Sequence, residues 1–251
     1  MEPGNLYTHI ENGIATIEFF HPAGNSLPSE LLNRIATAFN VFSDDDNVKV
    51  IILKSEKERT FCAGASLEEL LAINNPTDGV AFFAGFGKVV NAMRKCKKPI
   101  IGRIQGKAVG GGVGIIAACD YAMATEQASV KLSEISIGIG PFVVEPAIRR
   151  KIGVGAVGEL ALNPTMWQNA YWAKDKGLYA RVFDTVKDLD REIQILSEQL
   201  ASYSHEAVQH LKRVLWEGTE DWDKLINERA QICGHLVLSE TTKKALEKFK
   251  K

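Results

Sequence analysis

Three consecutive glycines form the most unusual chemistry-bearing feature of this sequence. Gly110-Gly111-Gly112 follows an apolar predicted strand over residues 99–104 and leads into a predicted helix over 111–118. Such a turn lets the backbone approach a ligand where a Cβ would clash, and it leaves N–H groups of the helix N-terminus unpaired. An anion, or an oxygen that becomes one, is the natural ligand of these groups. Taken alone, a triple glycine can equally well be a tight structural turn.

A second segment of small residues also precedes a predicted helix. Residues 60–66 (TFCAGAS) end at Ser66, which can cap a helix over 66–73, with Glu69 completing a capping box. Two such turns, each after a parallel strand, can direct two N–H groups at one oxygen, as in an oxyanion hole. A compact connection is the alternative for this segment. A dinucleotide-binding turn is the alternative for the glycines, but Ile115 stands where its third glycine should be.

The elements that must position these turns alternate between strands and helices. Residues 6–20 read as a hairpin around Asn12-Gly13, a strong tight-turn signal. Further predicted elements are a helix over 28–42, a strand over 48–53, a helix over 78–95, and strands over 121–125 and 129–132. Amphipathic helices are predicted at 189–203, 205–216, 221–233 and 240–250. The pattern predicts an α/β core over 1–185 and an all-helical region over 186–251, although alternation alone also permits a doubly wound sheet.

Composition excludes several classes of protein. The 251 residues carry 30 Lys+Arg and 31 Asp+Glu, so the net charge of −1 favours neither nucleic acid nor a membrane as the main partner. We find no signal segment and no apolar run long enough to span a bilayer. The four cysteines lack disulfide or metal-ligand spacing. These features predict a cytoplasmic protein without a metal.

Five segments together resemble the enoyl-CoA hydratase/isomerase (crotonase) family. The segments are 25–27 (NSL), 61–70 (FCAGASLEEL), 98–112 (KPIIGRIQGKAVGGG), 170–178 (AYWAKDKGL) and 246–250 (LEKFK). They occur in the family's order and span nearly the whole chain. The resemblance implies a spiral of ββα turns followed by a C-terminal helical trimerisation region. It also implies a homotrimer or a dimer of trimers.

The same resemblance implies roles for individual residues. Ala65 and Gly111 would supply the two N–H groups that bind the carbonyl oxygen of an acyl-CoA thioester and stabilise its enolate. Ala63 and Arg59 would line the path of the CoA moiety. Glu134 matches a catalytic glutamate of the family. The substrate would arrive as a CoA thioester, and no permanently bound cofactor is implied.

The sequence departs from the family pattern at the other catalytic glutamate. Family hydratases carry that residue at the position of Gly114, and Val143-Val144 replaces a pair of glycines further on. Because residues three apart share a helix face, Gly114 is expected to face the acyl cavity beside Gly111. A new carboxylate, Glu145, follows. It either begins a helix, which its negative charge would stabilise, or reaches the cavity as a second carboxylate.

The missing glutamate makes isomerisation the leading prediction. One carboxylate suffices to move a proton between two carbons, whereas addition of water needs groups for both the water and the carbon. The alternatives are an enoyl-CoA hydratase or a decarboxylase that uses Glu145, and a thioesterase on the same site. A catalytically weak acyl-CoA-binding protein is the alternative outside enzymes.

Overall fold

Strands alternate between two sheets along most of the chain. The computed structural model describes residues 3–57 and 59–249. The larger sheet has the order β1-β2-β3-β5-β7-β10, with β1 Asn5–Glu11, β2 Ile14–Phe20, β3 Val50–Ser55, β5 Ile100–Ile104, β7 Tyr121–Thr125 and β10 Arg181–Phe183. The smaller sheet has the order β4-β6-β8-β9, with β4 Thr60–Cys62, β6 Lys107–Val109, β8 Ser129–Lys131 and β9 Gln168–Asn169.

Helices close each turn of this winding. They are α1 Ser29–Asp44, α2 Leu67–Ala72, α3 Pro76–Lys95, α4 Gly111–Ala118, the 3₁₀ helix η1 Glu134–Ile137, α5 Glu145–Leu162, α6 Ala170–Asp175, α7 Val186–Ser202, α8 His205–Leu215, α9 Trp222–Leu236, α10 Glu240–Leu246 and the 3₁₀ helix η2 Glu247–Phe249. Strands β3, β5 and β7 enter the larger sheet, and β4, β6 and β8 follow in the smaller one before each helix. The predicted spiral of ββα turns is therefore confirmed.

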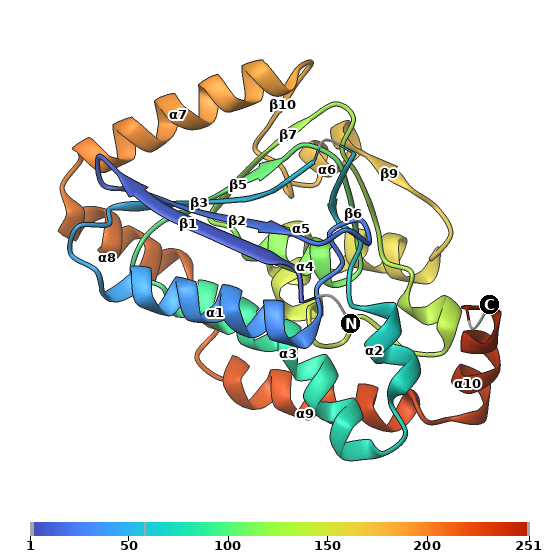
Figure 1. Ribbon diagram of the computed structural model, residues 1–251. Helices are drawn as coiled ribbons and strands as arrows, with labels where there is room; N and C mark the ends of the chain where they lie inside the picture. Colours follow the sequence, from blue (N-terminus) through green and yellow to red (C-terminus); the bar gives the residue numbers. More distant parts are fainter. Residues whose placement is uncertain (1–2, 58, 250–251) are drawn as a thin grey trace.

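Both faces of the inner strands of the larger sheet are covered (Figure 1), whereas the edge strand β1 is largely exposed. Ile51 and Leu53 of β3 belong to the main core with α1, α3 and α4, whereas Val50 and Ile52 pack with Leu189 of α7 on the other face. Successive strand residues point to opposite faces, so a strand covered on both sides must be apolar throughout. This requirement explains the uninterrupted run at residues 50–53. The predicted hairpin is also present, with positive φ at Asn12 (49°) and Gly13 (79°).

The C-terminal helices are attached to the core by packing and by one buried ion pair. Helix α9 packs along α3, and α10 contacts η1. Lys212 of α8 places its Nζ 2.9 Å from Asp120 Oδ2 and donates to the carbonyl oxygens of Met93 and Lys98. The final predicted helix, over 240–250, is an α-helix to Leu246 and continues as the 3₁₀ helix η2 to Phe249, and residue 250 lies outside the described residues.

The other face of α8 is exposed and apolar, at Leu211, Val214 and Leu215. Assembly into a trimer stays a prediction. None of the described helices is long and apolar enough to cross a membrane. Within residues 3–57 and 59–249, no group of three or more His, Cys, Asp or Glu side chains is arranged to hold a metal ion.

Candidate active site

The two small-residue turns lie side by side at one edge of the smaller sheet. Strands β4 and β6 are parallel neighbours, with Cys62 opposite Ala108, so the segments that follow them leave from the same edge. The approach is close enough that a Cβ on Gly112 would lie 2.7 Å from Cys62 Cβ. Among the described residues, the N–H groups of Ala65 and Gly111 have no acceptor. The geometry therefore leaves two adjacent N–H donors available for one oxygen.

The turn that contains Ala65 is held by residues 24–27. Leu27 N–H donates to Gly64 C=O (2.8 Å), and Ala63 N–H donates to Gly24 C=O (3.1 Å). The amide of Asn25 donates to the carbonyls of Glu56 (2.7 Å), which precedes β4, and Thr60 (2.9 Å), the first residue of β4. The NSL segment thus has a physical role in fixing the turn.

The predicted capping box is only half formed. Ser66 Oγ accepts from Glu69 N–H (3.3 Å), as expected for an N-cap. The carboxylate of Glu69, however, accepts from the N–H (2.9 Å) and hydroxyl (2.8 Å) of Ser29, at the start of α1. The Glu69 carboxylate therefore caps the N-terminus of α1, where a negative charge is stabilised. Sequence spacing could not reveal this partner 40 residues away.

A cavity of about 440 Å³ opens against these two turns. Its wall includes Ala65, Gly111 and Glu134. Much of the remaining wall is apolar and comes from α3, η1, the segment 139–144 and the C-terminal helices, at Phe82, Phe83, Phe86, Ile137, Ile139, Val143, Val144, Leu246 and Phe249. Such a wall is suited to an apolar ligand.

Glu134 is the only carboxylate among the described residues that line this cavity. It begins η1, which Leu132 and Ser133 connect to β8, and its Oε2 is buried without a hydrogen-bond partner. A Cβ on Gly110 would lie 2.6 Å from Glu134 Oε1, so the carboxylate lies against the glycine turn. Burial raises the pKa of Glu134 to about 7, because a carboxylate is poorly solvated there. Near neutral pH this group can both accept and return a proton.

Gly114 does not face the cavity in the way its helical spacing predicts. A Cβ on Gly114 would lie 2.4 Å from Val144 Cβ and 2.6 Å from Val144 Cγ1. Gly114 is also absent from the described cavity wall, which Val144 joins instead. Val144 therefore occupies the space that a side chain at position 114 would need, and the prediction that Gly114 itself faces the acyl cavity is wrong.

Glu145 and Glu134 are not brought together. Glu145 is the first residue of α5, as the helix-start alternative predicts. Its carboxylate forms ion pairs with Arg229 of α9 and, at 3.5 Å, with Arg149. Glu145 is not part of the described cavity wall. Its negative charge is thus directed toward two arginines rather than toward the acyl cavity.

The two residues expected to contact CoA have different positions. Ala63 lines the cavity, whereas Arg59 is exposed and does not. Sequence reasoning missed Phe82 and Phe86 as cavity residues, although their spacing of four places them on one helix face. It also missed Lys131 and Cys233, which line the cavity from β8 and α9.

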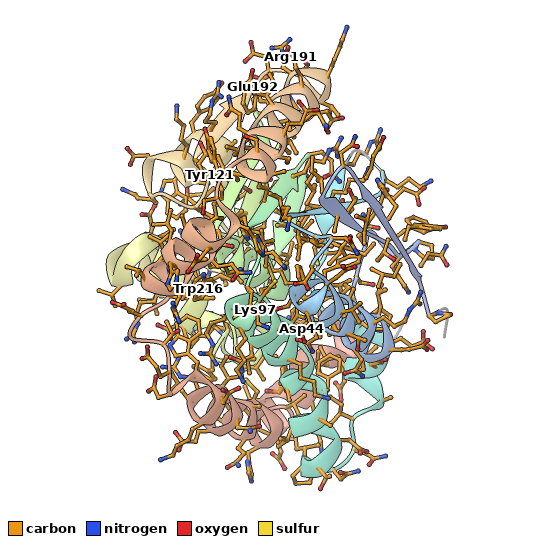
Figure 2. All side chains as sticks on the ribbon, turned by 90° about the vertical axis from the view of Figure 1, so that its left-hand side faces the viewer. Asp44, Lys97, Tyr121, Arg191, Glu192 and Trp216 are labelled. Atoms are coloured by element: carbon orange, nitrogen blue, oxygen red, sulfur yellow. The ribbon has the colours of Figure 1, made fainter. Side chains whose placement is uncertain are left out.

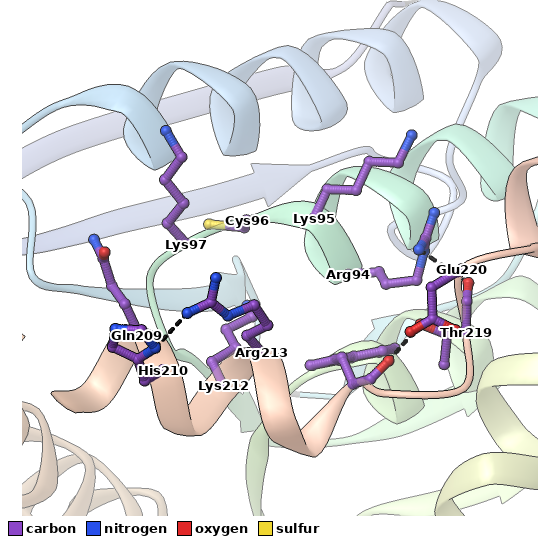
Figure 3. A pocket seen from close by; sticks show the side chains of 11 residues that line it. Arg94, Lys95, Cys96, Lys97, Gln209, His210, Lys212, Arg213, Thr219 and Glu220 are labelled. Carbon is purple, nitrogen blue, oxygen red and sulfur yellow. Dashed lines mark hydrogen bonds between the residues drawn. The ribbon is translucent and has the colours of Figure 1, made fainter. Parts of the chain in front are cut away.

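A second cavity, of about 410 Å³, lies between the end of α3 and α8 (Figure 3). It is rich in basic side chains, but most of them have carboxylate partners. Lys95 pairs with Asp223 (2.7 Å), and Lys97 pairs with Asp44 (2.8 Å), beside which it lies in Figure 2. We assign this cavity no role in the chemistry.

The fold and the site together define a crotonase-type enzyme. A solved structure of enoyl-CoA hydratase from Bacillus halodurans superposes with a TM-score of 0.90 at 22% identity, covering 97% of this chain and 99% of that one. The chain belongs to the enoyl-CoA hydratase/isomerase family, whose sequence profile matches residues 9–251.

Related proteins carry both kinds of name. A peroxisomal Delta(3,5)-Delta(2,4)-dienoyl-CoA isomerase of Arabidopsis thaliana is 28% identical, over 78% of this chain and 74% of its own length. A short-chain-enoyl-CoA hydratase of Clostridium acetobutylicum is 27% identical, over 99% of this chain and 95% of its own. The names of these relatives include both an isomerase and a hydratase, so they do not decide which reaction this chain catalyses.

Proposed function

We propose that this chain isomerises a 3-enoyl-CoA to the trans-2-enoyl-CoA. The observation that carries the proposal is the single carboxylate, Glu134, in a cavity whose second carboxylate position is filled by Val144. A pKa of about 7 suits a group that must act first as a base and then as an acid.

The reaction needs one proton to move and no atom to be added. Glu134 removes a proton from C2, and the electrons form an enolate whose oxygen accepts from the N–H groups of Ala65 and Gly111. The double bond moves from C3–C4 to C2–C3 as Glu134 returns the proton to C4. The two N–H groups stabilise the charge only while it exists, which lowers the barrier rather than merely binding the substrate.

Hydration is less well supported by this arrangement. Water must be held and deprotonated by one group while another protonates carbon. Glu145, the carboxylate that could replace the missing one, is paired with Arg229 and Arg149. A second carboxylate that could hold and deprotonate water is therefore absent from the described cavity wall.

A panel of thioesters tests the proposal. We expect the purified protein to convert 3-enoyl-CoA to 2-enoyl-CoA, and to hydrate 2-enoyl- or 3-methylglutaconyl-CoA much more slowly. Products separated by mass spectrometry distinguish the reactions, because hydration adds one water and isomerisation leaves the mass unchanged. Hydration faster than isomerisation would contradict the proposal.

Gly114 and Val144 should control the reaction type as a pair. Gly114→Glu alone is expected to destabilise the protein, because the new side chain overlaps Val144, and overpacking costs about 1–3 kcal/mol or more. The double variant Gly114→Glu/Val144→Gly removes that overlap and adds a second carboxylate. We expect it to hydrate 2-enoyl-CoA at least about tenfold faster than the parent. This increase is smaller than the rate enhancement that a well-positioned general acid or base typically supplies.

The matched control is Val144→Gly alone, which opens the same space without a carboxylate. Loss of the conjugated enoyl absorbance measures hydration in all variants, and thermal unfolding measures stability. A stable Gly114→Glu single variant with brisk hydration would show that Val144 does not block this position.

A further inference from the structure

The backbone of Gly111 lies directly against an aromatic ring. A Cβ on Gly111 would lie 2.2 Å from Cε1, 2.4 Å from Cδ1 and 2.5 Å from Cζ of Phe86, so the ring fills the place of the side chain that Gly111 lacks. The preceding residue, Gly110, lies against the Glu134 carboxylate. The peptide unit between Gly110 and Gly111 therefore has the Glu134 carboxylate at one end and Phe86 at the other.

This peptide unit needs such contacts, because glycine has no Cβ to restrict rotation of the backbone. Gly110 has φ 56° and ψ −120°, a conformation that residues with side chains rarely adopt. Its carbonyl oxygen accepts from Val113 N–H (2.9 Å), whereas the N–H of Gly111 has no acceptor among the described residues. The peptide is thus anchored at its carbonyl by a hydrogen bond and at its N–H end by packing.

The sequence of α3 explains how Phe86 reaches this position. Two glycines, Gly85 and Gly87, flank Phe86 in the middle of the helix, where glycine is unfavourable compared with alanine. A Cβ on Gly85 would lie 3.0 Å from Leu32 Cδ1 of α1, and a Cβ on Gly87 would lie 2.3 Å from Ile226 Cγ2 of α9. Helix α3 thus approaches both neighbouring helices closely, and these contacts fix the rotation of α3 that directs Phe86 at the glycine turn.

The ring also excludes water from one side of the turn. Phe86 is 6% exposed and belongs to the apolar wall of the active-site cavity. An N–H group in apolar surroundings interacts more strongly with a developing negative charge, because water does not screen the interaction. The orientation and the shielding of the Gly111 N–H would therefore both stabilise an oxyanion.

We propose that Phe86 is a positioning residue for Gly111: its ring fixes the direction of the Gly111 N–H and keeps water away from it. This inference rests on the proposed function, in which the enolate oxygen accepts from that N–H. Phe86 takes no part in the proton transfer itself. Because the negative charge on the oxygen is largest in the transition state, loss of the ring should lower kcat more than it raises KM.

Two substitutions weaken the contact in steps. Phe86→Met keeps a similar apolar volume but replaces the rigid ring by a flexible chain. Phe86→Leu has no atoms in place of Cε1 and Cζ, which face Gly111. We expect kcat for 3-enoyl-CoA to fall about tenfold in Phe86→Met and about 10²-fold in Phe86→Leu, the scale of a misplacement of about 1 Å at a reacting group.

The carbonyl stretching frequency of a bound thioester reports on the N–H donors directly. Hydrogen bonds to the carbonyl oxygen polarise the C=O bond and lower this frequency. The ligand is a saturated acyl-CoA, isotope-labelled at the thioester carbonyl and measured by infrared difference spectroscopy. We expect a lowered frequency in the parent, a return toward the value in water in Phe86→Met, and a larger return in Phe86→Leu. The frequency should change in step with the logarithm of kcat.

Phe42→Leu is the matched control. Phe42 of α1 is 7% exposed, close to the value for Phe86, but it does not line the cavity. This substitution should lower the thermal stability and leave kcat and the carbonyl frequency at the parent values. A role of Phe86 in stability alone would produce the same result in Phe86→Leu.

Two results would overturn the proposal. The first is a folded Phe86→Met protein with unchanged kcat and unchanged carbonyl frequency, and this outcome does not depend on whether Phe86→Leu folds. The second is a lower kcat without a change in frequency, which would mean that Phe86 acts elsewhere than at the carbonyl. The infrared measurement requires no turnover. A parent that shifts the carbonyl frequency but does not isomerise 3-enoyl-CoA would therefore contradict only the proposed function.

Discussion

Glu134→Gln is expected to lower isomerase turnover by at least about 10²-fold, the scale of a lost general acid/base. The amide is nearly isosteric but cannot take a proton from C2. Glu134 Oε2 makes no hydrogen bond to the protein, and the amide of glutamine keeps one oxygen that can accept the backbone hydrogen bonds of the carboxylate. Binding of a non-reactive acyl-CoA analogue should therefore change little. Turnover is measured as the appearance of conjugated 2-enoyl-CoA.

Glu145→Gln provides the matched control. Its carboxylate is paired with Arg229, so the substitution should affect stability more than turnover. A Glu134→Gln protein that keeps a rate near that of the parent would show that another residue carries the proton, and a large loss in Glu145→Gln would identify it.

The pH dependence of the parent gives an independent check on the same carboxyl group. With a pKa raised to about 7, the base form of Glu134 decreases about tenfold per pH unit below that value, so kcat/KM should rise with pH and level off above 7. The pKa of Glu134 in the folded protein exceeds the ordinary glutamate value of 4.5, so this group's contribution to stability is present below about pH 4.5 and lost as pH rises through 7. Glu134→Gln should thus be more stable than the parent at pH 8 but not at pH 4.

Ala65→Pro is expected to reduce turnover by about 10² to 10³-fold or more, because proline has no N–H and one of the two oxyanion donors disappears. The neighbouring bonds of the turn, from Ala63 to Gly24 and from Leu27 to Gly64, do not use the Ala65 N–H. The loss should therefore exceed any loss of folded protein, which circular dichroism and thermal unfolding report.

Ala65→Gly is the control for this substitution. It keeps the N–H and removes only a methyl group, so its rate should stay within about tenfold of the parent, well short of the effect of a lost oxyanion donor. Undiminished catalysis by a folded Ala65→Pro protein would remove the proposed carbonyl site.

The sequence predicted those elements whose signals are local. The hairpin follows from Asn12-Gly13, and α1 follows from its helical spacing of apolar residues. The smaller sheet was not predicted as a sheet, because β4, β6 and β8 have three residues each and β9 has two. Strands this short do not show a recognisable alternation of apolar and polar residues. They depend on pairing between distant segments of the chain.

The candidate site was predicted unevenly for the same reason. The motif matches named Ala65, Gly111 and Glu134, and all three line one cavity. The direction of Glu145 depends on Arg229, 84 residues later, and the space at Gly114 depends on Val144, which lies on another element. Local spacing contains neither contact, so the sequence could raise the question of a second carboxylate but could not answer it.

The bonds from residues 24–27 to the turn at 63–65 have a consequence for the energetics of the reaction. Water must rotate its dipoles when an enolate forms, and that reorientation is a large part of the barrier in solution. Here the peptide dipole of Ala65 is fixed in advance by neighbours that were ordered when the chain folded. Reorganisation at the moment of reaction is correspondingly small. In the proposed reaction the N-terminal segment, although it supplies no reacting group, would thus contribute to rate through the conformational entropy already lost in folding.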